Sequence, residues 1–281
     1  MELTTTTFRT IPIAAPARPA RAQLAVVVPL ANETATADEF LDRVGRQLLP
    51  TDLVFCVVDH ASTDDTWSRV LSRAANDPRI VPVWAPENRC VVDAYFRGYR
   101  AALDSTAEWI LEMDGGFSHL PEDIPRFIEA MQHGADYAAG SRFAGNGSHR
   151  GAWSRRLVSY GGTRLTNALL GTRMRDMTSG FECFTREALQ HVVSRGVRSR
   201  RHFFQTEIRC LLRDWNWVEV PITYAAPSPS LSRAAVIEAL RNLWWLRTQR
   251  RMQPRPERQT DSVHLPLPST QPLVEHSRRA A

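Results

Sequence analysis

The sequence predicts a single α/β domain with a mostly parallel central sheet flanked by helices. Three observations predict this fold. Apolar runs alternate with helical patterns between residues 24 and 148, two of the runs end at an acidic residue, and 281 residues at 43% hydrophobic content can bury one large core. We expect the domain to span 23–250, between a flexible N-terminal segment at 1–22 and a disordered tail at 251–281 that is rich in Pro, Arg, Ser and Gln.

The first half of the chain contains most of the expected parallel strands and the helices that join them. Ser62 or Thr63 is expected to cap the second helix, where Asp64 and Asp65 favour the positive end of the helix dipole. The expected strands are 24–30, 53–59, 79–84, 109–114 and 137–142, and the expected helices are 37–49, 67–75, 93–103 and 121–131.

From Trp153 onward the pattern changes to longer amphipathic helices, expected at 157–170 and 203–212, with a strand at 218–224. We expect this half to add an acceptor-binding side to the sheet. The last helix, 233–250, places tryptophans beside arginines. Such a helix suits a membrane headgroup interface, or it packs on the domain with a solvated basic face, and the sequence leaves both interpretations open.

Composition argues against several classes of protein. The net charge of +5 comes from basic residues spread along the chain, without a basic run or stacking-aromatic motif, so nucleic acid is not an expected partner. The four cysteines are far apart and show no zinc spacing. No apolar stretch of about 18 residues is present, and the N-terminus lacks a signal-peptide core. We expect a cytoplasmic protein, with peripheral contact at the inner membrane surface as an open option.

Two of the predicted strands end in a carboxylate. Asp59 closes the run 53–58, and Asp114 closes the run 109–113 directly before two glycines. In an open α/β sheet the carboxyl ends of the strands line the crevice where ligands bind. We therefore expect both carboxylates at one site, where they can hold a metal or a polar substrate.

Eight motifs lie in order along the chain: 26–33 (VVVPLANE), 58–66 (VDHASTDDT), 113–119 (MDGGFSH), 140–143 (GSRF), 154–156 (SRR), 175–181 (RDMTSGF), 204–207 (FQTE) and 219–223 (EVPIT). Together they resemble the family 2 glycosyltransferases of the GT-A, Rossmann-like fold, and most closely the polyprenol-phosphate (dolichol-phosphate) mannose synthase branch. The similarity covers about 24–247, and the ordered series is more specific than any single motif.

The resemblance implies a nucleotide sugar donor bound at the strand ends. Asp114 would face the donor diphosphate through Mg²⁺ or Mn²⁺, with Ser118 as a further metal ligand. A hard cation takes carboxylate and phosphate oxygens together and neutralises the departing diphosphate. The residues implied for the nucleotide are Pro29, Asn32, Glu33, Asp59, Ser62 and Asp114.

The resemblance also implies a lipid phosphate acceptor. A phosphate oxygen is already anionic near neutral pH, so its attack needs orientation more than a strong base. Arg142, Arg155 and Arg156 match positions that hold this phosphate, and a guanidinium fork suits two-point contact with it. Asp114 and Arg142 are the candidate catalytic residues. The implied reaction moves a hexosyl group, most simply mannosyl from GDP-mannose, to a polyprenyl phosphate by inverting displacement.

The chain departs from the family pattern mainly on the donor side. Gly116 stands in place of the second carboxylate of the DxD motif, His60 and Ala61 replace Asp and Gly, 90–93 replaces a glycine-rich turn, and Ser230 replaces a lysine. Three interpretations therefore stay open: transfer to a polyprenyl phosphate, transfer to a soluble specialised metabolite, and non-catalytic binding of a nucleotide sugar or lipid phosphate.

Overall fold

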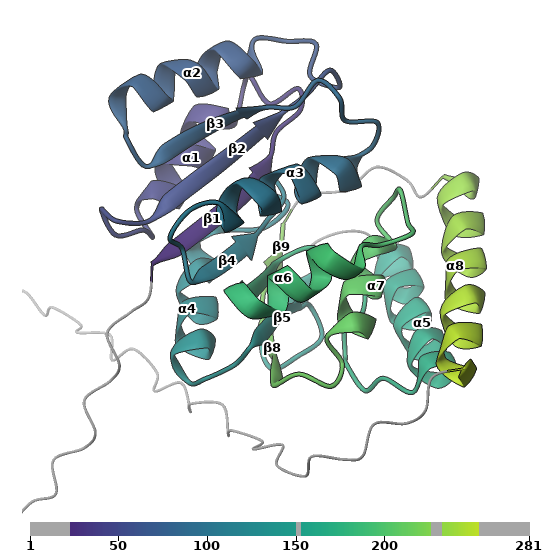
Figure 1. Cartoon of the computed structure of the whole chain (residues 1–281). Helices are drawn as coiled ribbons and strands as arrows, with labels where there is room; N and C mark the ends of the chain where they lie inside the picture. Colours follow the sequence, from purple (N-terminus) through teal and green to yellow (C-terminus); the bar gives the residue numbers. More distant parts are fainter. Residues whose placement is uncertain (1–22, 150–152, 226–231, 253–281) are drawn as a thin grey trace, which may run out of the picture.

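The computed structural model describes residues 23–149, 153–225 and 232–252 (Figure 1). The predicted N-terminal segment, Ser230 and all but two residues of the predicted tail lie outside this part. A seven-stranded sheet in the order β3-β2-β1-β4-β7-β5-β8 forms the centre, and helices cover both of its faces. The predicted α/β class with a mostly parallel sheet is confirmed.

The first four strands are parallel neighbours and lie where the apolar runs predict them. They are β1 (Leu24–Pro29), β2 (Leu53–Val58), β3 (Ile80–Trp84) and β4 (Trp109–Glu112). β1 lies between β2 and β4, and residues 24–28 are completely buried because both faces of the sheet are covered. Its side chains alternate between the two hydrophobic cores of the domain.

Each core is closed by its own set of helices. One face carries α1 (Ala37–Gly45), α2 (Thr66–Asn76) and α4 (Ile124–Gln132), the last preceded by the short helix η1 (Pro121–Asp123). The other face carries α3 (Val91–Leu103), α6 (Arg186–Arg195) and α7 (Phe204–Leu211). α3 approaches closely because Gly98 has no side chain: a Cβ there would lie 2.3 Å from Cγ1 of Val27.

The second half of the sheet differs from the sequence prediction. β7 (Glu182–Thr185) and α6 were not expected, and β7 lies antiparallel between β4 and β5 (Tyr137–Ser141). The expected strand 218–224 is two strands: β8 (Trp217–Pro221) joins the main sheet, and β9 (Thr223–Tyr224) pairs with β6 (Ser148–His149). β7 is a short strand that starts with a buried glutamate, so it lacks the apolar run that marked the other strands.

Two long helices lie side by side at one end of the domain (Figure 1). These are α5 (Trp153–Leu170) and α8 (Arg233–Met252), joined by a hydrogen bond from Nη1 of Arg247 to the carbonyl of Leu169 at 3.3 Å. α8 continues two residues beyond the predicted domain end at 250. No helix in the described ranges is long and apolar enough to cross a bilayer.

Candidate active site

Asp114 lies two residues beyond the end of β4, in a loop at the carboxyl edge of the sheet. Its side chain is 43% exposed. The hydroxyl of Tyr95, on α3, donates a hydrogen bond to Oδ1, and Oδ2 lies 3.8 Å from Nδ1 of His119. One carboxylate oxygen is thus fixed from the protein side while the group as a whole stays open to a ligand.

The loops after β1 and β2 interlock beside this carboxylate. The backbone N–H of Asn32 donates to Oγ of Ser62 at 3.1 Å, and its side-chain amide donates to the carbonyl of Ala61 at 3.0 Å. The N–H of Thr63 donates to Oδ1 of Asn32 at 3.0 Å. The structure therefore brings together Asn32 and Ser62, two of the residues predicted to bind the nucleotide.

The prediction that Ser62 or Thr63 caps α2 is wrong: Asp65 is the N-cap residue and makes no side-chain capping hydrogen bond. Asp64, one residue earlier, holds the start of the helix instead. Its Oδ1 accepts the backbone N–H of Thr66 at 3.1 Å, and its Oδ2 accepts the N–H of Thr34 at 3.0 Å. Hydrogen bonds from the hydroxyls of Thr34 and Thr66 hold the pKa of Asp64 well below its usual value. Asp64 therefore ties the loop after β1 to the start of α2.

Asp59 follows β2, as predicted, and takes part in the same loop structure. Oδ1 accepts the N–H of Ala61 at 2.8 Å, and Oδ2 accepts the side-chain amide of Asn88 at 3.0 Å. The neighbouring His60 is exposed and packs edge-on against Trp84, with ring centroids 5.4 Å apart. Position 60 is where the family pattern has a second aspartate, and in this chain the residue there is a histidine that packs on Trp84.

Glu33 takes up the space that a side chain at position 116 would need. A Cβ built on Gly116 would lie 2.4 Å from Oε1 of Glu33, and the backbone of Gly116 has a φ of +69°. The neighbouring Gly115 is almost as tight, since its Cβ would lie 2.5 Å from Cδ2 of Leu30 and 3.2 Å from the carbonyl of Pro29. The glycines therefore let the loop that carries Asp114 pack directly against the loop after β1.

His119 supports the Asp114 loop from inside the protein. Its Nδ1 accepts the backbone N–H of Asp114 at 3.2 Å, and its ring stacks on Phe181 with centroids 5.1 Å apart. Burial lowers the pKa of His119, although the nearby Asp114 charge opposes that shift. A neutral ring with its proton on Nε2 fits these contacts, so His119 is a positioning residue for the loop.

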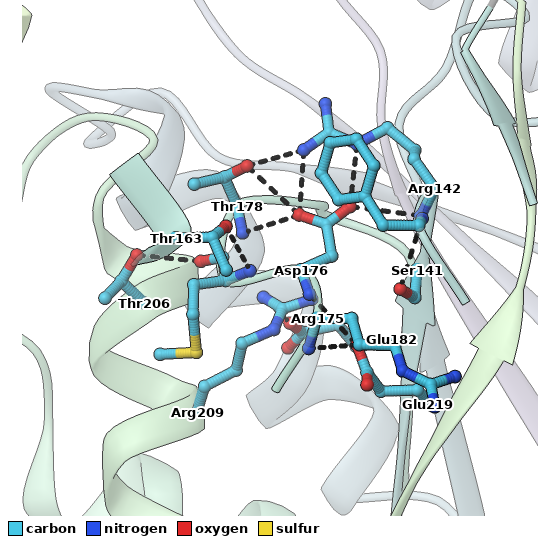
Figure 2. Close-up of polar contacts among 12 residues, drawn as sticks. Ser141, Arg142, Thr163, Arg175, Asp176, Thr178, Glu182, Thr206, Arg209 and Glu219 are labelled. Carbon is cyan, nitrogen blue, oxygen red and sulfur yellow. Dashed lines mark hydrogen bonds and ion pairs between the residues drawn. The ribbon is translucent and has the colours of Figure 1, made fainter. Parts of the chain in front are cut away.

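Arg142, the predicted acceptor-phosphate residue, is buried in a two-point ion pair with Asp176 (Figure 2). Nε donates to Oδ2 at 2.8 Å and Nη2 donates to Oδ1 at 2.9 Å, while Nη2 also donates to the hydroxyl of Thr178. Burial alone would raise the pKa of Asp176, but the charge and hydrogen bonds of Arg142 bring it to about 2. The pair fixes the plane of the guanidinium group.

The segment that carries Asp176 is itself held by three different elements (Figure 2). Oε1 of Glu219, on β8, accepts the N–H of Asp176 at 3.0 Å. Oγ1 of Thr163, on α5, accepts the N–H of Met177 at 3.1 Å, and Thr206, on α7, donates to the Met177 carbonyl at 2.8 Å. The orientation of Arg142 is thus set by the packing of the whole second half of the domain.

Arg142 and Asp114 are connected through one aromatic pair, Tyr224 and His119. The guanidinium carbon of Arg142 is 5.6 Å from the ring centroid of Tyr224, and the ring of Tyr224 is 5.7 Å from that of His119. Arg156 is exposed on α5, and the side chain of Arg155 lies outside the described part of the structure. The two candidate catalytic residues therefore each contact one member of the same aromatic pair, and no described contact places Arg156 beside them.

A buried cluster of charges lies beneath Asp114. Glu112 on β4 and Glu182 on β7 are direct neighbours across the two strands, and both are completely buried. Arg209 on α7, equally buried, forms an ion pair with Glu182. Burial and the second carboxylate raise the pKa of Glu112 well above its usual value, and burial raises that of Glu182 to about 7. The shift favours the protonated form of Glu112, which is also too deep to meet a metal at the surface.

The residues at the carboxyl edge of the sheet fit a divalent cation only if the substrate and water supply most of its ligands. Among the described residues, no three His, Cys, Asp or Glu side chains are grouped as a metal site. Mg²⁺, however, is commonly held by one or two carboxylates together with substrate phosphates and water. Asp114 suits that arrangement. Ser118, the other predicted ligand, is half-buried in the same loop, where its carbonyl accepts the N–H of Ala225 at 3.1 Å.

Sequence reasoning missed three residues that shape the site: Tyr95, His119 and Asp176. His119 and Asp176 lie within motifs that were recognised, but their roles appear only in the folded structure, where His119 supports the Asp114 loop and Asp176 pairs with Arg142. Tyr95 gave no signal, because a tyrosine on the apolar face of a helix cannot be told from an ordinary core residue.

The sheet is open, carries the Asp114 loop at the carboxyl edge of its parallel half and contains one inserted antiparallel strand. These features are typical of the GT-A class of folds. A family model places the chain more narrowly. The protein belongs to glycosyl transferase family 2, which matches residues 25–193, and it is a glycosyltransferase. The resemblance inferred from the motifs is confirmed.

Characterised relatives agree with this placement. Polyprenol monophosphomannose synthase of Mycolicibacterium smegmatis is 30% identical over 212 residues, covering 74% of this chain and 79% of the relative. Undecaprenyl-phosphate mannosyltransferase of Micrococcus luteus is 30% identical over 202 residues, covering 70% and 82%. Dolichol-phosphate mannosyltransferase of Pyrococcus furiosus is 26% identical over 232 residues, which span 80% of this chain and 63% of that protein.

A solved structure supports the fold. Glucosyl-3-phosphoglycerate synthase from Mycobacterium tuberculosis, crystallised with Mn²⁺, uridine diphosphate and phosphoglyceric acid, matches with a TM-score of 0.60. The two proteins are 17% identical, and the match covers 84% of this chain and 80% of the other. At this identity the likeness concerns architecture alone.

Proposed function

We propose that the protein transfers a hexosyl group, mannosyl from GDP-mannose, to a polyprenyl phosphate by inverting displacement. The observation that carries the proposal is the half-exposed carboxylate of Asp114 beside the interlocked loops of Asn32 and Ser62. The names of the three mannosyltransferase relatives support the choice of sugar and acceptor. The nucleotide would lie along Pro29, Asn32, Glu33, Asp59 and Ser62.

The donor diphosphate would meet Asp114 through Mg²⁺ or Mn²⁺, with Ser118 and Glu33 close to the same loop. Such a cation neutralises the charge that develops on the leaving diphosphate. Asp114 holds its place because Tyr95 binds one oxygen and His119 binds its backbone N–H. The protein would thus supply one fixed carboxylate to the cation, and the donor diphosphate would supply most of the other oxygen ligands.

On the acceptor side, the phosphate oxygen attacks the anomeric carbon while the bond from that carbon to the diphosphate breaks and its electron pair leaves with the nucleotide. Attack from the opposite face inverts the anomeric centre. Arg142 would orient the acceptor phosphate, with Arg155 and Arg156 at the entrance. Asp176 holds Nε and Nη2 of Arg142, and Nη1 has no partner among the described residues. That amino group is the one available for a phosphate oxygen.

A lipid acceptor calls for contact with a membrane surface, and the paired helices α5 and α8 offer one. Their exposed apolar side chains lie beside exposed Arg156, Arg164 and Arg241. Apolar side chains among arginines suit an anionic lipid interface. The apolar members are Leu157, Val158, Tyr160 and Leu165 on α5, and Val236, Ile237, Leu240 and Trp244 on α8. We call these eight residues the helix-pair face.

A direct experiment tests the proposed reaction. Full-length protein is incubated with GDP-mannose, Mn²⁺ and a short-chain polyprenyl phosphate, and mass spectrometry is used to look for a lipid-linked hexose. Asp114→Ala should abolish the product while the circular dichroism spectrum stays unchanged. Turnover by this variant at the wild-type rate would refute the role of Asp114.

The same assay separates the alternatives. A hexose on a soluble acceptor, with none on the polyprenyl phosphate, would assign the protein to specialised metabolism. If calorimetry shows nucleotide binding that Mn²⁺ does not change, and no sugar is transferred to either acceptor, the protein is a nucleotide-sugar-binding protein without transfer activity.

A further inference from the structure

Gly180 lies between the side chains of Gln205 and Asp114, which come from different parts of the chain. A Cβ built on Gly180 would lie 3.1 Å from Nε2 of Gln205 and 3.7 Å from Oδ1 of Asp114. Gln205 is the second residue of α7, whereas Asp114 follows β4. Because residue 180 has no side chain, an amide and a carboxylate flank the same small space.

Gln205 is held rigidly at this point. It is 3% exposed, and its Oε1 has no hydrogen-bond partner among the described residues. The next residue, Thr206, anchors α7 to the carbonyl of Met177, and the buried carboxyl group of Glu112 lies beside the Gln205 amide. A buried amide oxygen without a partner is costly, so a residue of this kind indicates a polar group that binds there.

We propose that Gln205 recognises the hexosyl group of the donor, with its side-chain amide and the Asp114 carboxylate forming hydrogen bonds to sugar hydroxyls across Gly180. This inference rests on the proposed function, since it requires a nucleotide sugar at Asp114. It assigns to Gln205 a part of donor binding that depends on the sugar.

The chemistry of the pair favours hydroxyl groups over a phosphate. A carboxylate accepts hydrogen bonds and repels a bare anion, whereas an amide both donates and accepts. A sugar hydroxyl also donates and accepts, so it can bridge the two side chains. Sites built to hydrogen-bond a hydroxyl reject analogues that lack it or place it elsewhere, because a buried polar group is then left unpaired. Gln205 would therefore discriminate between hexose epimers.

The test compares the affinity for the intact donor with the affinity for the donor without its sugar. Gln205→Leu and Gly180→Ala are measured by isothermal titration calorimetry with GDP-mannose and with GDP, both in the presence of Mn²⁺. Each variant should bind GDP-mannose about tenfold more weakly, the loss expected for one hydrogen bond within a buried site, and should bind GDP as the wild type does. The alanine acts by displacing the Gln205 amide.

Two controls match these changes. Gln190 is exposed on α6, and a Cβ on Gly161, in α5, would meet nothing within 4 Å. Gln190→Leu and Gly161→Ala should bind both ligands as the wild type does. The proposal is overturned if Gln205→Leu weakens GDP and GDP-mannose equally, or weakens neither, while the wild type transfers the hexose. If the wild type itself binds no nucleotide sugar, the proposed function fails instead.

A kinetic measurement adds a readout that a purely structural role would not change. The ratio of kcat/KM for GDP-mannose to that for GDP-glucose should fall at least severalfold in Gln205→Leu. Equal losses with both donors, in a variant that keeps the wild-type Tm, would show that Gln205 does not recognise the sugar.

Discussion

The carboxylate of Glu33 packs against the bare Cα of Gly116, so close that a Cβ at position 116 would lie 2.4 Å from Oε1 and 2.9 Å from Oε2. Position 116 is where the family pattern places its second acidic residue. In this chain a carboxylate from the loop after β1 reaches the same place. The hydroxyl of Thr36 donates to Oε2 of Glu33 and helps to hold it there.

Gly116→Ala should destabilise the protein by about 1–3 kcal/mol, because it combines an unfavourable positive φ with a clash against Glu33. Gly134→Ala is the matched control: its φ is +87°, but a Cβ there meets nothing within 4 Å. Chemical denaturation should show a larger loss for Gly116→Ala than for Gly134→Ala. Adding Glu33→Ala should recover the difference in a double-mutant cycle. Equal losses at the two glycines would show that Glu33 does not fill the space.

Tyr95→Phe should weaken donor binding, because it removes the hydroxyl that donates to Oδ1 of Asp114. A hydrogen bond to a charged group contributes about 1.5–3 kcal/mol. We expect the KM for the nucleotide sugar to rise by about tenfold or more. Tyr99→Phe is the control on the same helix, since the Tyr99 hydroxyl has no partner among the described residues, and its KM should stay at the wild-type value. A similar KM in both variants would contradict a role for Tyr95 in positioning Asp114.

Asp176→Asn should cost about 3–5 kcal/mol of stability, the usual penalty for leaving a buried charge without its partner, here Arg142. Asp214→Asn breaks the exposed ion pair with Arg213, which has an N–O distance of 3.1 Å, and should cost about 1 kcal/mol or less. The folded-state pKa of Asp176, about 2, is below its unfolded value. Its stabilising effect is therefore complete above about pH 4 and is lost as the pH falls toward 2. Urea titrations from pH 2.5 to 7 should show this acid-dependent loss in the wild type and not in Asp176→Asn.

Glu112→Gln should stabilise the protein increasingly as the pH rises. Burial and the neighbouring Glu182 raise the pKa of Glu112 in the folded state, so folding takes up a proton above pH 4.5 and the wild type loses stability with rising pH. Glutamine resembles the protonated acid and avoids that loss. The difference in Tm between variant and wild type should grow from pH 5.5 to pH 8.5, and Glu108→Gln, at an exposed position, should show no such growth. A constant difference would mean that Glu112 is ionised in the folded protein.

The parallel half of the sheet could be predicted from the sequence because its strands are local apolar runs and its carboxylates follow them directly. The inserted strand β7 could not be predicted in this way. It begins with Glu182, a buried carboxylate whose ion-pair partner, Arg209, lies 27 positions further along the chain. Arg142 was recognised from its motif, but its fixed orientation depends on Asp176, which lies 34 positions later. Residues that belong to a local sequence motif could thus be predicted, whereas roles that depend on a partner far along the chain could not.

The helix-pair face should bind anionic membranes. Full-length protein should sediment with vesicles that contain phosphatidylglycerol, and binding should weaken in pure phosphatidylcholine and at high salt, because exposed arginines lie beside the apolar side chains. Trp244→Ser and Ile237→Ser, which are 65% and 64% exposed in the wild type, should reduce binding without lowering the Tm. Leu71→Ser is the control, since Leu71 is 45% exposed on α2, away from this face. If the wild type stays in solution with every vesicle and instead dimerises in analytical ultracentrifugation, with Trp244→Ser monomeric, the face is an interface between two copies of the chain.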